Sequence, residues 1–189
     1  MSLVPAFELG VWNAWIFILP LLTLEVIGSR IFGKRGSEGS SDRTRKEKML
    51  ESVAMVIFFA SCAYAVFLPL ELGTFLFYAG SLLYILGMLI VTTALLSFHT
   101  TPVDKPVTKW IYRFSRNPMY LGLFLISIGI GIACASWVFV LLTAVFIILT
   151  STSVTLEERF CLQKYGNAYR EYMNRIPRWI GMPRSEKKG

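Results

Sequence analysis

The stretch SRNPMYLG, residues 115–122, joins a basic polar segment to the longest apolar run of the chain, which continues to Val154. A single helix over this run of about 37 residues would be roughly 55 Å long, nearly twice the thickness of the hydrocarbon layer of a membrane. The run therefore predicts two membrane helices that fold back on each other near residues 134–136. Its first residues predict a helix that begins at Pro118 and is capped by the side chain of Asn117.

The composition indicates an integral membrane protein. Of the 189 residues, 54% are hydrophobic and 16% are charged, and the mean hydropathy is +0.56, which is too apolar for a soluble domain. Three further apolar runs, Leu9–Gly28, Val53–Leu70 and Thr74–Phe98, are each long enough to cross a bilayer once. The predicted fold is an all-α membrane bundle of about five transmembrane helices, followed by a cytoplasmic C-terminal helix.

All nineteen Lys and Arg residues fall in three segments that would lie on the same side of such a bundle. Seven lie in residues 30–48, four in residues 105–116 and eight in residues 159–188, whereas the opposite side carries only Glu8 and Glu71. Because short cytoplasmic segments are enriched in Lys and Arg, we expect the N-terminus outside and the C-terminus in the cytoplasm. The net charge of +7 is then explained by topology and by attraction to membrane lipids, and no nucleic-acid partner is expected.

The cysteine and histidine content predicts neither a disulfide framework nor a metal centre. Cys62, Cys134 and Cys161 are far apart and form no CxxC motif, and His99 is the one histidine. No organelle signal is visible, so a prokaryotic inner membrane is the expected location. The oligomeric state stays open.

Two polar clusters bracket the predicted hairpin. Tyr112 and Arg116 precede it, and a second cluster follows it. The second cluster consists of Glu157, Glu158, Tyr165, Tyr169, Tyr172 and Arg175. Because both ends of a hairpin lie at the same membrane face, the two clusters predict one site. The alternative is that the two glutamates form a solvated pair at the start of a cytoplasmic helix, where the helix dipole favours acids.

Glu25 is the one acidic residue inside a predicted span. An ionisable group at membrane depth is a candidate for function. Glu25 lies only about one helical turn before Arg30, so the alternative is a paired or solvated position at the membrane interface.

Four groups of residues occur together in roughly the last 90 residues. They are VTKWIY at 107–112, RNPMY at 116–120, the Glu157-Glu158 pair, and the tyrosines, Arg and Pro within 165–177. Together they resemble the isoprenylcysteine carboxyl methyltransferase and phospholipid methyltransferase superfamily, whose hallmark is Arg-His-Pro-x-Tyr, a membrane hairpin and a Glu-Glu pair. The resemblance implies an enzyme that binds S-adenosylmethionine at the cytoplasmic face and methylates a lipophilic substrate arriving from the bilayer.

The resemblance also implies roles for particular residues. It places the cofactor against Asp104, Lys105, Pro106, Val107, Tyr112, Asn117, Pro118, Met119, Tyr120 and Glu157. It implies catalytic roles for Arg116 and Glu158. Methyl transfer from a sulfonium needs positioning and exclusion of water rather than a metal or a covalent nucleophile. Residues 101–189 would then form the catalytic part, and residues 1–100 would supply three membrane helices and a basic cytoplasmic loop.

The sequence departs from the superfamily at two positions. Asn117 occupies the place of the hallmark histidine and cannot titrate, although it can donate and accept hydrogen bonds. Ser153 occupies a place where the prenylcysteine enzymes carry an arginine suited to a substrate carboxylate. The methyl acceptor therefore stays open among a carboxylate, an amine and a thiol.

Two alternative functions stay open. The segment EERFCLQKYG, residues 157–166, also resembles the tail of the longer membrane sterol reductases, which use NADPH, and Arg159, Arg170 and Arg175 could bind its 2′-phosphate. The other alternative is a non-catalytic membrane protein of the same fold, in which the changes at Asn117 and Ser153 have removed activity.

Overall fold

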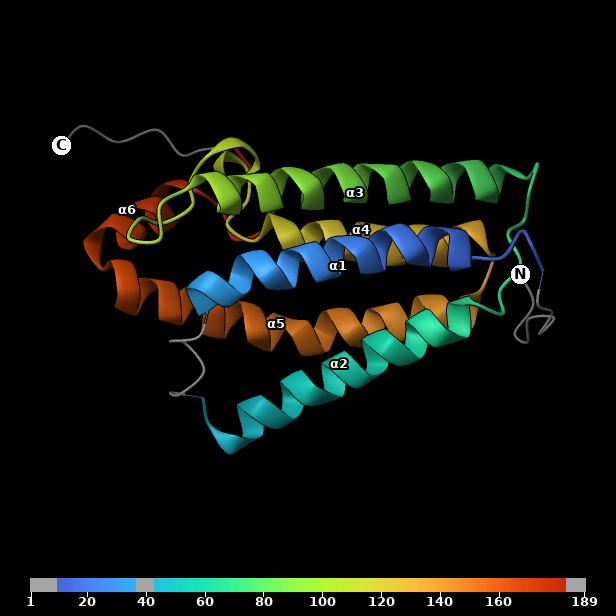
Figure 1. Ribbon diagram of the computed structural model, residues 1–189, viewed down its shortest axis with the longest axis horizontal. Coiled ribbons are helices and arrows are strands. Elements are labelled where there is room, and N and C mark those ends of the chain that lie inside the picture. Colours follow the sequence, from blue (N-terminus) through green and yellow to red (C-terminus); the bar gives the residue numbers. More distant parts are fainter. Residues whose placement is uncertain (1–9, 37–42, 183–189) are drawn as a thin grey trace.

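The computed structural model describes residues 10–36 and 43–182, and every regular element in these ranges is helical (Figure 1). The elements are α1 (Trp15–Gly36), α2 (Arg45–Ala65), α3 (Phe75–Thr100), the 3₁₀ helix η1 (Trp110–Arg113), α4 (Pro118–Ala133), α5 (Trp137–Tyr165) and α6 (Asn167–Arg175). The helices α1 to α5 run along the long axis of the molecule, and α6 lies at the end where α5 finishes (Figure 1). The predicted all-α class is confirmed.

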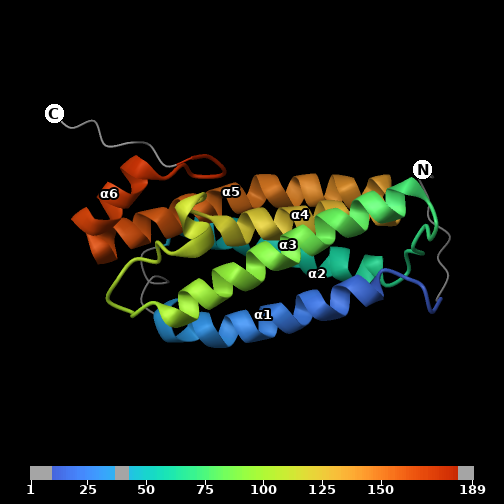
Figure 2. The same cartoon turned by 90° about the horizontal axis from the view of Figure 1, so that it is seen from above.

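The bundle is that of a multi-pass membrane protein. Within the described residues, three helices, α2, α3 and α5, are long and apolar enough to cross a membrane, and α4 is an apolar helix of 16 residues. Figures 1 and 2 show α3 beside both α1 and α4, and α5 beside both α2 and α4. Large exposed hydrophobics are spread along these helices, as expected of surfaces that face lipid.

The predicted hairpin is confirmed. Helix α4 ends at Ala133 and α5 begins at Trp137, so the chain reverses at residues 134–136. Ala135 adopts a left-handed backbone angle, with φ of 47°, and Ser136 caps α5 by accepting a hydrogen bond from the Phe139 N–H at 3.3 Å. A polar cap inside an otherwise apolar run is what divides it into two helices.

The boundaries predicted for the first two spans were wrong. The described part of α1 starts at Trp15 and continues to Gly36, past the expected end at Gly28; residues 1–9 lie outside the described part. Helix α2 runs from Arg45 to Ala65 instead of residues 53–70. It starts early because Thr44 and Glu47 form a capping box, so a helix begins within the basic segment that we expected to be a loop.

Four glycines bring α3 and α4 into close contact. A β-carbon on Gly87 would lie 2.6 Å from the carbonyl oxygen of Gly122, and one on Gly129 would lie 2.7 Å from the carbonyl oxygen of Gly80. Both distances are too short for any side chain, so the two backbones approach as only small residues allow, which is a common means of helix association in membranes. This contact fixes the start of α4, and with it the residues 116–120, against α3.

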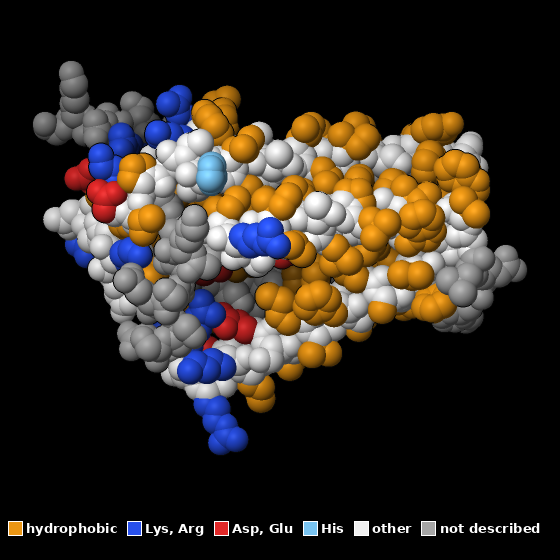
Figure 3. Space-filling model, viewed as in Figure 1, with side chains coloured by type: hydrophobic (Ala, Val, Ile, Leu, Met, Phe, Trp, Pro, Cys, Tyr) orange, Lys and Arg blue, Asp and Glu red, His pale blue; other side chains and the backbone are white. Residues whose placement is uncertain are grey.

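The charged side chains gather at one end of the molecule. Figure 3 shows Lys and Arg side chains concentrated at the end that holds α6, while hydrophobic side chains cover most of the remaining face. At the opposite end, Asn13 donates from its side chain to the Val66 carbonyl at 3.0 Å and ties the start of α1 to the end of α2. The charged end contains the residues from which a site could be built.

Candidate functional site

Two segments that are distant in the sequence are joined at the charged end of the bundle. The Arg116 N–H donates to the Pro177 carbonyl at 3.1 Å, and the Gly181 N–H donates to the Phe114 carbonyl at 3.1 Å. The segment before α4 is thereby attached to the tail after α6. The ring of Trp179 in this tail lies 5.7 Å from the ring of Phe124, which holds the tail against α4.

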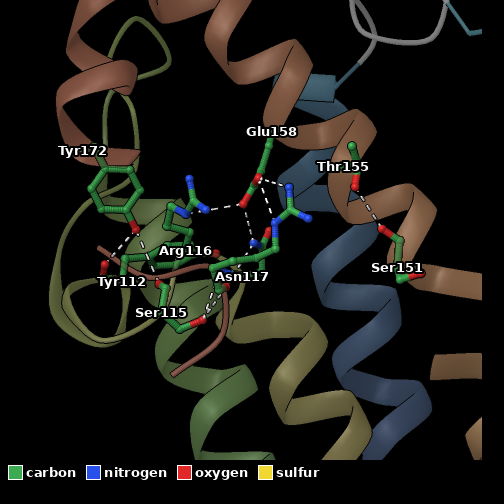
Figure 4. Close-up of polar contacts among 9 residues, drawn as sticks. Tyr112, Ser115, Arg116, Asn117, Ser151, Thr155, Glu158 and Tyr172 are labelled. Atoms are coloured by element: carbon green, nitrogen blue, oxygen red, sulfur yellow. Dashed lines mark hydrogen bonds and ion pairs between the residues drawn. The ribbon is translucent and has the colours of Figure 1, made fainter. Parts of the chain in front are cut away.

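The carboxylate of Glu158 is contacted by polar side chains of several segments at this end of the molecule (Figure 4). Its side chain is only 4% exposed on α5, and Asn117 donates to it from Nδ2 at 2.9 Å. Arg178 donates to its other oxygen from Nη2 at 2.7 Å and from Nε at 3.1 Å. A buried carboxylate needs such partners to offset its lost hydration. The alternative of a solvated pair is therefore wrong for Glu158.

Asn117 does not cap α4 as we predicted. It precedes the helix and Pro118 is the first helical residue, but the Asn117 side chain makes no capping hydrogen bond. Its amide donates instead to Glu158 and to the Arg178 carbonyl, at 2.9 and 3.2 Å. The Asn117 backbone N–H donates to Ser115 Oγ at 3.1 Å. Asn117 thus joins α4, α5 and the tail, which a cap would not do.

Tyr120 and Glu157 form a second link between the ends of the hairpin. The Tyr120 hydroxyl donates to Glu157 Oε1 at 2.7 Å, from the first turn of α4 to α5. Glu157 is exposed, unlike its neighbour Glu158. The two adjacent glutamates therefore differ in environment, because Glu158 is buried beside two arginines and Glu157 is exposed.

Arg116 carries a buried donor that is not satisfied within the described protein. Its side chain is 11% exposed, and its Nε lies 3.5 Å from Glu158 Oε1 without forming a hydrogen bond to any described residue. An unmade hydrogen bond at a buried donor costs free energy, so such groups call for a physical reason. The position next to Asn117 makes Arg116 a candidate for binding an anionic part of a ligand.

Two buried tyrosines support the loop beneath this network. The Tyr172 hydroxyl donates to the Tyr112 carbonyl at 2.7 Å and to the Ser115 carbonyl at 3.4 Å (Figure 4). Burial raises the pKa of the Tyr112 hydroxyl well above its usual value, and burial likewise raises the pKa of Tyr172. Both hydroxyls therefore stay protonated near neutral pH, and Tyr172 remains a donor that fixes residues 112–115.

The residues predicted to bind a cofactor fall into three groups. Asn117 and Tyr120 meet the glutamates of α5, and Pro118 and Met119 share the same turn. Val107 is buried with Tyr112 in a cluster that also contains Tyr169, Tyr172 and Ile176. Asp104 and Lys105 are exposed on the loop after α3, with Pro106 half-buried beside them. No side-chain hydrogen bond or ion pair joins Asp104 or Lys105 to a described residue.

Arg178 is the residue that the sequence analysis missed. We placed Arg175 in the second polar cluster, but Arg175 is exposed on α6, and Arg178 is the residue that pairs with Glu158. The available signal was the run Pro177-Arg178-Trp179, in which an arginine follows a proline just beyond the predicted helix. The distance in sequence from Glu158 concealed the pairing, because it depends on how the tail folds back.

The arginines considered for NADPH binding do not gather around Glu158. Arg159 is 59% exposed and lies 3.7 Å from Glu47 of α2. Arg170 and Arg175 are exposed on α6. The site is instead built from a buried carboxylate, an amide and two arginines of different segments.

Comparison with known proteins gives a consistent set of relatives. Residues 70–168 match the phospholipid methyltransferase family. Probable protein-S-isoprenylcysteine O-methyltransferases of Oryza sativa, from subspecies indica and japonica, are each 27% identical over 180 residues, covering 87% of this chain and 93% of the relative. Methanethiol S-methyltransferase 1 of Bradyrhizobium diazoefficiens is 31% identical over 99 residues, covering 52% of this chain and 34% of that protein. The family match includes Arg116, Asn117, Tyr120 and both glutamates.

Proposed function

The chain belongs to the phospholipid methyltransferase family and is a membrane methyltransferase, and from this premise we propose that it uses S-adenosylmethionine to methylate a lipophilic acceptor. The observation that carries the proposal is the pairing of the start of α4 with the end of α5, through Asn117–Glu158 and Tyr120–Glu157. These pairs connect the residues on which the resemblance rests. Family membership favours methyl transfer over the reductase and non-catalytic alternatives.

The residues present fit S-adenosylmethionine. This cofactor carries a carboxylate, an ammonium, ribose hydroxyls, adenine and a sulfonium, and it supplies the methyl group. Arg116 offers a buried Nε donor that makes no hydrogen bond to a described residue and that would bind the carboxylate. Glu157 offers an exposed carboxylate for a cationic or hydroxyl group, and the Tyr120 ring beside it would contact the sulfonium. Asp104, Lys105 and Pro106, on the loop after α3, are further residues that would hold the cofactor.

Glu158 would act as a positioning residue and not through contact with the substrate. Its two oxygens are already bound by Asn117 and Arg178, and the Arg116 side chain lies beside them. The carboxylate holds Arg116 in place and keeps the tail against α4. Preorganised side chains of this kind are what a methyl transfer requires, because the reaction depends on alignment more than on acid–base chemistry.

Asn117 excludes acid–base catalysis by the side chain at position 117. An amide does not titrate near neutral pH, so no proton leaves the substrate through Asn117. Its amide instead donates to the Glu158 carboxylate, a role that a hydrogen-bonding imidazole could also fill. The Asn117 amide would thereby keep the binding and orientation of the cofactor without a histidine at this position.

The orientation is proposed from the charge distribution. The end that carries α6, where Lys and Arg side chains gather in Figure 3, would face the cytoplasm. The N-terminus would lie outside, and α1 to α5 would be the five membrane-crossing helices. The cofactor would then reach the site from the cytoplasm, and the lipophilic substrate would reach it from the bilayer. The catalytic part would be residues 101–189, in what we propose to be a prokaryotic inner membrane.

Calorimetric titration of the full chain in detergent tests the cofactor. We expect S-adenosylmethionine and S-adenosylhomocysteine to bind and NADPH not to bind. Binding of NADPH without binding of either sulfur compound would contradict the proposal and favour the reductase alternative. No binding of any of the three by a folded protein would favour the non-catalytic alternative.

A further inference from the structure

An exposed apolar patch lies outside the membrane-crossing helices, at the charged end of the bundle. Its four residues come from two segments and are each between 51% and 86% exposed: Trp110, Phe114, Ile180 and Met182. The two segments form one surface, because the N–H of Gly181, between Ile180 and Met182, donates to the Phe114 carbonyl at 3.1 Å. Large apolar side chains that gather in this way mark an interaction surface. These four residues are termed the η1–tail patch.

Trp110 adopts a strained backbone conformation. Its φ is 51°, in the left-handed region that a bulky side chain rarely enters. Strain of this kind costs free energy and persists where other interactions offset it, often at a functional position. The residue stays exposed, so burial within the described part of the protein does not offset the strain. The conformation instead presents the Trp110 side chain to something outside the protein.

The tail lies at the depth of the membrane interface. Trp179, directly before Ile180, packs against Phe124 of α4 with 5.7 Å between the ring centres. Phe124 lies about two turns into α4, roughly 9 Å from the charged end at which this helix starts. In the proposed orientation the tail therefore follows the cytoplasmic edge of the bundle. Tryptophan and other aromatic side chains are enriched at this level of a membrane.

Cations accompany the apolar residues of the patch. Lys109 and Arg113, at the two ends of η1, are exposed, and neither side chain pairs with an acid among the described residues. The segments 105–116 and 172–182, which include the patch, contain no Asp or Glu. A surface that is both apolar and cationic complements the headgroup layer of a leaflet with anionic lipids. A soluble acidic partner would match the cations but not the depth of the tail.

We infer that the η1–tail patch binds the anionic headgroup layer of the cytoplasmic leaflet and that this contact stabilises the candidate site. The second part rests on the proposed function. The same tail carries Arg178, which donates to Glu158, and Pro177, whose carbonyl accepts from the Arg116 N–H. Lipid on the outer side and Glu158 on the inner side thus bind one segment. A lipid that favours the docked tail therefore favours the arrangement of Arg116 and Glu158.

A nitroxide spin label attached to the full chain at Met182→Cys tests the lipid contact without the cofactor. Cys62 and Cys134 are buried and Cys161 is half-buried, so the parent treated with the same reagent gives the background. Nanodiscs contain phosphatidylcholine with or without phosphatidylglycerol, and electron paramagnetic resonance measures access of oxygen and of a water-soluble nickel complex. With phosphatidylglycerol, we expect high access of oxygen and low access of nickel. A label at Arg175→Cys, exposed on α6, should show the opposite.

Two results of the labelling experiment would overturn the inference. One is equal access of the nickel complex to the two labelled positions in both lipid mixtures, as expected if the tail faces the cytoplasm. The other is dipolar broadening between labels on different molecules, which would show that a second copy of the chain covers the patch.

Paired substitutions test the role of the cations. Each Lys or Arg near an anionic surface strengthens binding by about 5-fold, so Lys109→Ala with Arg113→Ala should raise the phosphatidylglycerol content needed to bury the label. The matched control is Arg170→Ala with Arg175→Ala, at two exposed arginines of α6, which should leave the label buried. Equal burial of the label in the two paired variants, both folded, would contradict the electrostatic contact.

Calorimetry in the same nanodiscs tests the link to the site. We expect the parent to bind S-adenosylmethionine more tightly with phosphatidylglycerol than without it, and Lys109→Ala with Arg113→Ala to lose this difference. Equal affinity of the parent in both lipid mixtures would overturn the link. Absence of binding in both mixtures would count against the proposed function alone, because burial of the label does not require the cofactor.

Discussion

The side-chain amide of Asn117, just before α4, donates a hydrogen bond of 2.9 Å to the buried carboxylate of Glu158 on α5. This bond joins the two ends of a helical hairpin and makes the start of one helix depend on the end of the other. Arg178 binds the second oxygen of the same carboxylate, so the tail after α6 belongs to the same unit. Substitutions at Asn117 should therefore affect the start of α4, the end of α5 and the tail after α6.

Replacing Asn117 separates a hydrogen-bonding role from a titrating one. Asn117→His should keep near-normal affinity for S-adenosylmethionine, because histidine can also donate to Glu158. Asn117→Leu leaves the buried carboxylate short of one donor, which costs about 1–3 kcal/mol, so we expect cofactor affinity to fall by about 5- to 150-fold. Calorimetry on both variants measures the difference. Equal affinity of the leucine variant and the parent would exclude Asn117 from the site.

Replacing Glu157 should affect the ligand more than the fold. Glu157 is exposed and receives one bond from Tyr120, so Glu157→Gln keeps the helices in contact while it removes a charge. We expect cofactor affinity to fall about 10-fold or more with little loss of thermal stability. Glu158→Gln, which leaves Arg178 less compensated, should lower stability by about 3 kcal/mol or more. The reverse order of effects would show that the two glutamates have been assigned the wrong roles.

Much of the fold could be predicted because the membrane helices are marked by apolar runs whose lengths can be read from the sequence. The apolar run from Pro118 to Val154 is too long for one membrane crossing, and its length alone required a turn. The end of α1 and the start of α2 could not be found from hydropathy. Helix α2 begins at Arg45 because a capping box stabilises it, and a charged segment with such a cap is helical although it is not apolar.

The site could be predicted only for those residues that lie at the ends of the hairpin in the sequence. Asn117 and Tyr120 were placed opposite the glutamates because hairpin ends must meet. Arg178 was missed because its contact with Glu158 depends on the tail folding over α4, where Trp179 packs on Phe124. Such a contact is set by tertiary structure and leaves no periodic signal in the sequence.

The close contact of α3 and α4 should be sensitive to one methyl group. In Gly87→Ala the new β-carbon would lie 2.6 Å from the Gly122 carbonyl oxygen, so the helices must separate. Overpacking of this kind costs about 1–3 kcal/mol, and the melting temperature in detergent should fall accordingly. Leu89→Ala, on the exposed side of the same helix, is the control and should change the melting temperature little. A parent-like Gly87→Ala would mean that the backbones do not approach closely.

The buried tyrosines predict a loss of stability at alkaline pH. An unfolded tyrosine ionises near pH 10, whereas burial raises the pKa of Tyr172 in the folded protein. Above about pH 10 the unfolded chain loses a proton that the folded protein keeps, so the free energy of unfolding falls by about 1.4 kcal/mol per pH unit for this group. Below pH 10 its contribution is fully present. Tyr172→Phe should therefore reduce the slope of the free energy of unfolding against pH above pH 10.

Arg116 provides the sharpest test of the cofactor site. Its Nε is buried and makes no hydrogen bond to a described residue, so a ligand carboxylate would gain a strong charge-assisted bond there. Arg116→Lys keeps the charge but loses the planar donor group, and we expect affinity for S-adenosylmethionine to fall by about 10-fold or more. Arg116→Ala should abolish measurable binding while the protein stays folded, as gel filtration and melting in detergent would verify. The matched control is Arg175→Ala, an exposed arginine on α6, which should bind like the parent. If Arg116→Ala binds the cofactor as tightly as the parent does, the missing hydrogen bond at Nε has another cause, and the carboxylate must bind elsewhere on the charged end of the bundle.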